Sequence, residues 1–127
     1  MFTHITVGAN DVEASRKFYD AALGALGHEP GQGPDAKGRY WWRTRMGAFA
    51  VGKPIDGEAA CHANGGTIGF GARDEAAVKA FHEAGLANGG TAIEDPPGPR
   101  TGPFGTLNLA YLRDPSGNKI CALYRVG

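Results

Sequence analysis

The chain has 127 residues, which is enough for one domain with a substantial hydrophobic core and too few for two independent ones. Its 13 basic and 13 acidic residues balance, and no basic run occurs, which argues against nucleic-acid binding through phosphate contacts. No apolar stretch approaches the roughly 18 residues of a membrane helix, and no signal-peptide pattern opens the chain. With only two cysteines in such a chain, we expect free thiols in a reducing compartment and a cytoplasmic location.

An internal repeat organises the sequence. Residues 3–27 recur as residues 66–90 at a constant offset of 63 positions, and nine of the 25 aligned positions are identical. Unrelated segments would share about two. A match at one fixed offset indicates two copies of one supersecondary unit. We therefore expect a single domain, 1–127, with module 1 at about 1–54, a linker at 55–65 and module 2 at about 66–127.

Each module opens with a strand and a helix. The strands Thr3–Gly8 and Thr67–Ala72 run directly into Asp11 and Asp74, whose short carboxylates suit helix N-caps. Apolar residues behind each aspartate fall on one helical face. The short extended segments that follow are Gly27–Pro30, Gly38–Thr44 and Ala48–Gly52 in module 1, and Thr91–Glu94, Gly105–Arg113 and Lys119–Val126 in module 2. Each module is therefore predicted as βαβββ.

Two connections in module 2 stand out. Asp95–Pro103 contains four prolines and two glycines and is expected to be a long loop, a class that is often functional. Asp114-Pro115-Ser116-Gly117-Asn118 is expected to be a tight turn, because proline presets one backbone angle and glycine supplies a positive φ.

The repeated unit, the opening His4-Ile5-Thr6-Val7 before Asp11 and the closing Asp114–Ile120 resemble the vicinal oxygen chelate superfamily. That group includes glyoxalase I, extradiol dioxygenases and bleomycin-resistance proteins. The resemblance covers nearly the whole chain and implies an α+β fold in which two tandem βαβββ modules form a cupped mixed sheet around a ligand cavity. It also implies a homodimer. Because this fold hosts unrelated chemistries, the resemblance does not fix the function.

Metal-dependent members of the superfamily place ligands on the first and last strands of each module. Here the first position is His4, its repeat equivalent is Thr67, the position on the last strand of module 1 falls near Phe49 or Val51, and the final position is Cys121. Only His4 is retained as the family's ligand. We therefore expect no metal and no other cofactor, although a divalent ion held by His4, Cys121 and His62 remains an alternative.

The remaining candidates are side chains on strands or loops expected near the cavity. His4 and Cys121 are candidate catalytic residues, because an imidazole beside a thiol can create a reactive thiolate, while a packed thiol is the simpler interpretation. Since Trp41 and Trp42 are neighbours in a strand, they must point to opposite faces. The substrate-binding candidates are Tyr40, Trp42, Thr67, Arg100, Asn108 and Tyr111.

Several functions stay open at this point. The first is a glyoxalase-family protein that binds a small organic molecule, with aromatic compounds among the candidates, and acts as a lyase or isomerase with a degenerate metal site. The second is a binding protein that sequesters its ligand, as bleomycin-resistance proteins do. The third is a metal-dependent lactoylglutathione lyase-like or dioxygenase enzyme. The sequence does not decide whether the protein is an enzyme, and it does not identify the substrate.

Overall fold

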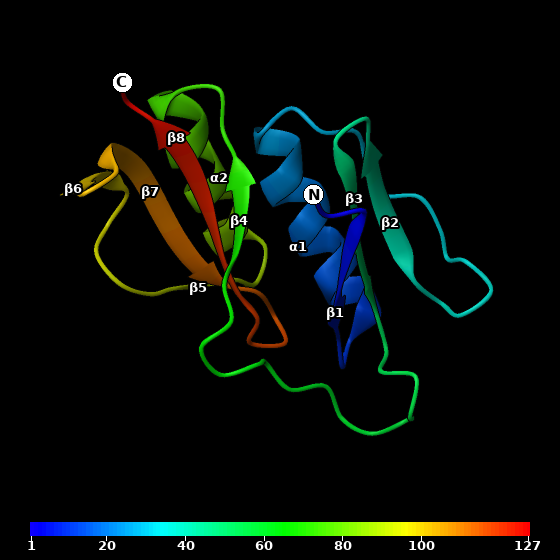
Figure 1. Cartoon of the computed structure of the whole chain (residues 1–127). Helices are drawn as coiled ribbons and strands as arrows, with labels where there is room; N and C mark the ends of the chain where they lie inside the picture. Colours follow the sequence, from blue (N-terminus) through cyan, green and yellow to red (C-terminus); the bar gives the residue numbers. More distant parts are fainter.

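The computed structural model describes residues 1–127 and shows two modules in tandem, each opening with a strand and a helix (Figure 1). Module 1 continues with two strands and module 2 with four, whereas the sequence predicted three in each. Module 1 comprises β1 (His4–Gly8), α1 (Val12–Ala25), β2 (Tyr40–Thr44) and β3 (Gly47–Gly52). Module 2 comprises β4 (Ile68–Gly71), α2 (Glu75–Ala87), β5 (Thr91–Ala92), β6 (Gly98–Gly102), β7 (Gly105–Arg113) and β8 (Lys119–Arg125).

Both helices begin where the sequence predicts. The Asp11 carboxylate accepts a hydrogen bond from the Ala14 amide at 3.0 Å, and the Asp74 carboxylate accepts one from the Ala77 amide at 2.7 Å. Each bond satisfies an amide that has no partner within its own helix. The two predicted N-caps are thereby confirmed.

The strands form two separate mixed sheets. Sheet 1 has the order β1-β3-β2, and sheet 2 has the order β4-β8-β7-β5, with β6 also pairing with β7. In each sheet the first strand of the module lies at one edge and runs parallel to the last strand, β3 or β8. No ladder joins β1 to β4, so the two modules do not share one continuous sheet within the chain.

The structure differs from the sequence-based expectation at two segments. Gly27–Pro30 forms no strand, and only an isolated bridge between Gln32 and Trp41 marks that sheet edge. The predicted loop Asp95–Pro103 contains β6, which pairs antiparallel with the first half of β7. Its Gly-Pro-Arg-Thr-Gly sequence lacks apolar alternation because an edge strand is held mainly by backbone hydrogen bonds.

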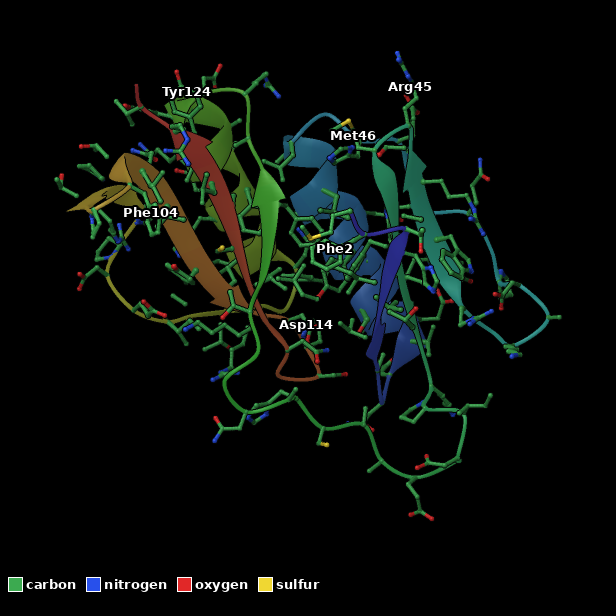
Figure 2. All side chains as sticks on the ribbon, viewed as in Figure 1. Phe2, Arg45, Met46, Phe104, Asp114 and Tyr124 are labelled. Carbon is green, nitrogen blue, oxygen red and sulfur yellow. The ribbon has the colours of Figure 1, made fainter.

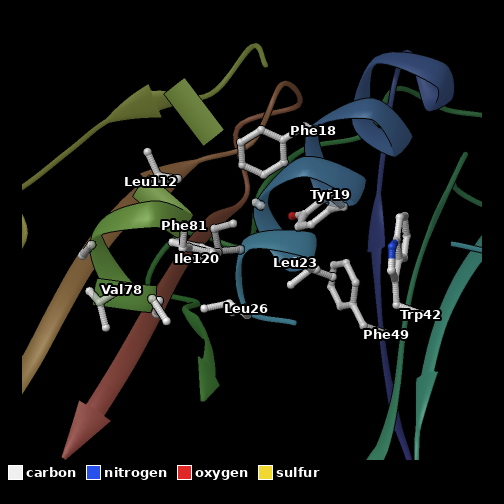
Figure 3. Close-up of a cluster of buried hydrophobic side chains, with 14 of the residues drawn as sticks. Phe18, Tyr19, Leu23, Leu26, Trp42, Phe49, Val78, Phe81, Leu112 and Ile120 are labelled. Carbon is white, nitrogen blue, oxygen red and sulfur yellow. The ribbon is translucent and has the colours of Figure 1, made fainter. Parts of the chain in front are cut away.

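One core joins the two modules. Figure 3 shows α1 and α2 packed together, with β7 and β8 beyond α2 and the strands of sheet 1 beyond α1. The cluster of buried side chains draws on both helices and both sheets, from Phe18 and Tyr19 to Phe81 and Ile120. Ring contacts continue across the seam, where Phe49 and Phe70 meet edge to face at 5.2 Å.

A buried polar network also links the modules. Asp114 (labelled in Figure 2) accepts hydrogen bonds from the Tyr19 hydroxyl at 2.6 Å and from the Asn118 side-chain amide at 2.9 Å. Asn118 also donates to the Gly8 carbonyl at 3.0 Å. The predicted turn after β7 therefore connects module 2 to α1 and β1 of module 1 through buried hydrogen bonds.

No helix is both long and apolar enough to cross a membrane.

Candidate functional site

Each sheet has one side that packs on the helices and one that faces away from them. We call the latter its cup face. On sheet 1 the cup face comprises His4, Thr6, Trp41, Arg43, Ala48 and Ala50. On sheet 2 it comprises Gly69, Gly71, Leu107, Leu109, Tyr111, Arg113, Lys119, Cys121, Leu123 and Arg125. The assignment follows from strand alternation, because the residues between them, such as Phe49, Leu112 and Ile120, lie in the core.

The cup face of sheet 1 is centred on Trp41. The guanidinium groups of Arg39 and Arg43 lie 5.1 and 4.3 Å from its ring centroid, and the His4 ring lies 6.0 Å away. These are cation–π distances. The result is an aromatic surface with two cations and an imidazole beside it.

Asp35 fixes this aromatic surface in place. Its carboxylate accepts from the Trp41 indole at 2.8 Å, from the Arg39 side chain at 2.9 Å and from the Arg39 and Lys37 amides. The hydrogen bond from Trp41, together with those from the backbone, holds the pKa of Asp35 well below its usual range. Asp35 is therefore ionised at neutral pH, and both of its carboxylate oxygens accept hydrogen bonds from within the protein.

The cup face of sheet 2 carries a related arrangement. The Lys119 ammonium lies 5.0 Å from the centroid of the Tyr111 ring and forms an ion pair with Glu94. Burial, followed by the charge of the adjacent Cys121, raises the pKa of the Tyr111 phenol. An aromatic ring with a cation beside it thus occupies the outer face of each sheet.

The two aromatic residues occupy equivalent positions in the repeat. Trp41 pairs with Ala50, whose other neighbour is Thr6, and Tyr111 pairs with Cys121, whose other neighbour is Gly69. Thr6 and Gly69 correspond at the offset of 63. By the same pairing Arg43 corresponds to Arg113, so each module carries an aromatic-x-Arg motif on its cup face.

The strand register corrects one of the expected metal positions. Ala48 lies beside His4 and Ala50 beside Thr6 on the cup face, whereas Phe49 and Val51 point into the core. The sequence predicted Phe49 or Val51 for this position, one residue away from Ala48 or Ala50. In a strand, a shift of one residue moves the side chain to the opposite face of the sheet.

The side chains at the family's metal positions do not fit a divalent ion. They are His4, an alanine, Thr67 and Cys121, and no cluster of three or more His, Cys, Asp or Glu side chains occurs anywhere in the chain. Zinc sites normally use at least three protein ligands, and magnesium requires carboxylate or other oxygen ligands.

His4 and Cys121 do not meet within the chain. His4 is exposed on sheet 1, where its Nδ1 lies 2.9 Å from the Thr3 hydroxyl, and Cys121 is buried in sheet 2. Burial raises the pKa of the Cys121 thiol to about 11. This is the environment of a packed, protonated thiol, and a reactive thiolate would need the opposite shift.

This environment predicts a difference between the two cysteines. At pH 7.5 we expect 5,5′-dithiobis(2-nitrobenzoate) to modify the exposed Cys61 and to leave Cys121 unmodified, so that one thiol reacts in the native protein and two react in guanidinium. Raising the pH toward 11 should make Cys121 reactive as its thiolate forms. Rapid native modification of Cys121 at pH 7.5, tested in Cys61→Ser, would contradict this account.

The substrate-binding candidates divide between the two sides of the sheets. Tyr111 lies on the cup face, and the exposed Thr67 immediately precedes β4. Trp42 packs in the core against Tyr19 and Phe49, and the Tyr40 hydroxyl donates to Glu13 of α1 at 2.8 Å. The buried Asn108 shares the helix-facing side of β7 with Ala110 and Leu112. Tyr40, Trp42 and Asn108 therefore do not lie on the cup face where we expected them.

Arg100 is occupied by its own loop. Its guanidinium donates to the carbonyls of Asp95, Pro96, Gly98 and Leu109 at 2.9 to 3.3 Å. These bonds attach the segment before β6 to β7. The guanidinium of Arg100, a substrate-binding candidate in the sequence, is thus used to hold its own loop.

Trp41, Arg43 and Lys119 on the cup faces, and Glu94 beside Lys119, were not among the sequence-based candidates. Strand alternation showed that the two tryptophans point to opposite faces, and the structure places Trp41 on the cup face and Trp42 on the helix side, where it lines a pocket with Phe49 and Phe70. The Arg two residues after each aromatic residue was a usable signal, because positions i and i+2 of a strand share a face.

Two hollows adjoin sheet 1. A pocket of about 270 Å³ lies at the seam between the edges of β1 and β4, with Phe2, Met46 and Phe70 among its lining residues. A wider hollow of about 750 Å³ lies between sheet 1 and the linker, with Lys37, Arg39 and Lys53 against a single acid, Asp56. Asn10 holds this linker by hydrogen bonds to both backbone groups of Ala60, at 2.7 and 3.3 Å.

The chain is similar to several solved structures of known family. A glyoxalase/bleomycin resistance protein from Albidiferax ferrireducens T118 shares 55% sequence identity with it, with a TM-score of 0.94 over 98% of this chain and 99% of that one. A glyoxalase-related enzyme from Fulvimarina pelagi shares 18% identity, with a TM-score of 0.70 over 98% of this chain and 88% of that one. A lactoylglutathione lyase from Agrobacterium tumefaciens shares 18% identity, with a TM-score of 0.66 over 97% of this chain and 92% of that one.

Neither the family models nor the curated proteins give a match to this sequence. The two relatives at 18% identity establish the fold alone. The first relative matches at 55% identity over essentially the full length of both chains, with a TM-score of 0.94. On this evidence, the chain belongs to the glyoxalase/bleomycin resistance protein family of the vicinal oxygen chelate superfamily.

Proposed function

We propose that the protein binds a small aromatic anion on its cup faces without a resident metal ion. The observation that carries this proposal is the pairing of an aromatic ring with cations on both faces, Trp41 with Arg39 and Arg43, and Tyr111 with Lys119. Aromatic rings offer a stacking surface, and guanidinium groups recognise carboxylates by paired hydrogen bonds.

The distribution of charge supports an anionic ligand over a cationic one. The whole chain has no net charge, and the cup faces and the hollow beside sheet 1 carry Arg39, Arg43, Lys53, Arg113 and Lys119 against Asp35, Asp56 and Glu94. Asp35 pairs with Arg39 and Glu94 pairs with Lys119, which leaves Arg43 and Lys53 as cations without an ion pair. A sequestering protein for cationic drugs would need the opposite surface charge.

We infer that a ligand enclosed by both cup faces lies between two chains. Both helix-facing sides pack into one core, and no hydrogen bond, ion pair or ring contact joins the two cup faces within the chain. The outer edges of β1 and β4 have no strand partner, and the exposed Phe2 and Met46 lie beside the seam pocket between them (Figure 2).

We therefore include a homodimer in the proposal, with β1 of one copy beside β4 of the other. Such an arrangement is isologous, would cover both open edges and would bring a cup face of each kind together. Light scattering should give twice the chain mass of 13.2 kDa. A monomer at ligand-binding concentrations would remove this part of the proposal.

The two tryptophans give a matched test of where the ligand binds. We expect 4-nitrobenzoate, an aromatic anion that quenches tryptophan fluorescence, to quench Trp42→Phe saturably and to lose most of this effect in Trp41→Phe. Trp41 lies on the cup face and Trp42 in the core, 4% exposed. Arg43→Met should weaken binding about tenfold because it removes a cation beside the ring. Equal quenching of the two tryptophan variants would contradict the proposed site.

A metal-free lyase or isomerase is the second candidate function, and it rests on His4. Its imidazole lies 6.0 Å from Trp41 on the same face, where it could exchange a proton with a ligand stacked there. His4→Gln should then abolish turnover and leave the affinity for 4-nitrobenzoate within about twofold. Turnover that survives this substitution would exclude the role of His4.

A further inference from the structure

Glu94 has an unusual backbone conformation for its residue type. It is the only residue other than glycine with a positive φ, at 61°. The left-handed region is unfavourable for a side chain such as glutamate, which has no short polar group to offset the crowding. Residues held in this way cluster at ligand clamps and switches, so the outlier calls for a functional explanation.

The Glu94 side chain is aimed at the cup face of sheet 2. Its carboxylate forms an ion pair with the Lys119 ammonium, and their side chains are 44% and 26% exposed. Lys119 in turn lies 5.0 Å from the Tyr111 ring centroid. A carboxylate beside a cation and an aromatic ring is the arrangement expected of a bound aromatic carboxylate, here provided by the protein itself.

We propose that Glu94 is an internal counter-ion, which the carboxylate of an aromatic ligand displaces from Lys119. This inference rests on the proposed function and narrows it to aromatic carboxylates that pair with Lys119 and stack on Tyr111. A partly exposed ion pair is weak, so an external carboxylate with additional ring contacts can replace it.

The consequence for affinity is quantitative. A ligand that pairs with Lys119 can bind only while Lys119 is free of Glu94. Its apparent dissociation constant is therefore the intrinsic constant divided by the fraction of time for which Lys119 is free. If the internal pair forms about nine-tenths of the time, removing the Glu94 charge strengthens binding about tenfold. A purely structural ion pair between these residues has no such effect on affinity.

Calorimetry with 4-nitrobenzoate and its neutral analogue 4-nitrobenzamide tests this. We expect Glu94→Gln to bind 4-nitrobenzoate about tenfold more tightly than the wild type, and Lys119→Met to bind it about tenfold more weakly. Asp95→Asn is the matched control, because it removes one negative charge at the next residue, whose side chain forms no ion pair. Binding of 4-nitrobenzamide should be the same in every variant.

Glu94→Gly keeps the test independent of folding, because glycine accepts the left-handed conformation without strain. It should reproduce the tighter binding of Glu94→Gln. If 4-nitrobenzoate binds the wild type and both Glu94 variants equally, the counter-ion role is wrong and the proposed function stands. If neither compound binds the wild type, the proposed function and the counter-ion role fail together.

Discussion

Replacing Asp114 with alanine is expected to lower the free energy of unfolding by about 3–5 kcal/mol. Asp114 is 4% exposed and accepts hydrogen bonds from the Tyr19 hydroxyl, the Asn118 side chain and the amides of Ser116 and Asn118. Without the carboxylate, buried donors from both modules lose their acceptor. Thermal unfolding followed by circular dichroism should show a midpoint lower by on the order of 10–20 °C.

The control is Asp95→Ala, which removes an exposed carboxylate that makes no side-chain hydrogen bond. It should change the free energy of unfolding by less than about 0.5 kcal/mol. A loss below about 1 kcal/mol for Asp114→Ala would show that the network does not hold the modules together.

The same network should make stability depend on alkaline pH. Burial, followed by the charge of Asp114, raises the pKa of Tyr19 well above its ordinary value of 10.0. The neutral phenol therefore contributes its full stabilisation below about pH 10, and this contribution is lost as the pH rises through the higher folded-state pKa. Tyr19→Phe should lose this part of the pH dependence, which denaturant titrations at pH 8, 10 and 11 would measure. The same pH dependence in Tyr19→Phe would assign it to other groups.

Replacing Phe81 with alanine is the second change with a large expected effect. Phe81 is fully buried in α2, in the cluster that both modules share (Figure 3), and its ring lies 6.5 Å from that of Phe70. Removing a buried phenylalanine costs about 3–5 kcal/mol through lost burial and the cavity that remains. Equilibrium denaturation in urea measures this loss.

Leu86 offers a matched control on the same helix. It is 43% exposed, so Leu86→Ala should cost less than about 1 kcal/mol. Because the core is shared, tryptophan fluorescence and circular dichroism should report one transition with the same midpoint in Phe81→Ala. Two separate transitions would mean that the modules unfold independently.

The elements predicted best were those with a local cause. Asp11 and Asp74 cap helices that begin at Val12 and Glu75, because a capping carboxylate acts on amides two or three residues away. β7 spans Gly105–Arg113 as expected, since alternation and bounding turns mark it within one segment. β6 was missed because its pairing with β7 leaves no alternating apolar pattern in its own sequence.

The placement of the candidate site residues was predicted less well, for two reasons. Alternation showed that Trp41 and Trp42 face opposite sides, but the facing of each depends on how β2 pairs with β3. The same uncertainty moved the expected metal position from Ala48 or Ala50 to Phe49 or Val51. For Arg100, the four carbonyls that hold it meet only after β6 folds onto β7.

The sequence by itself determined the tandem repeat, the two helix starts and the family resemblance, because repeats, caps and periodicity are properties of continuous segments. Only the tertiary structure decided which side chains form the cup faces, that His4 and Cys121 lie on different sheets, and that Glu94 meets Lys119. These facts depend on strand register and on contacts between segments far apart in the chain. A shift of one residue in a strand would exchange the side chains of its two faces, and the local pattern of the sequence does not encode that choice.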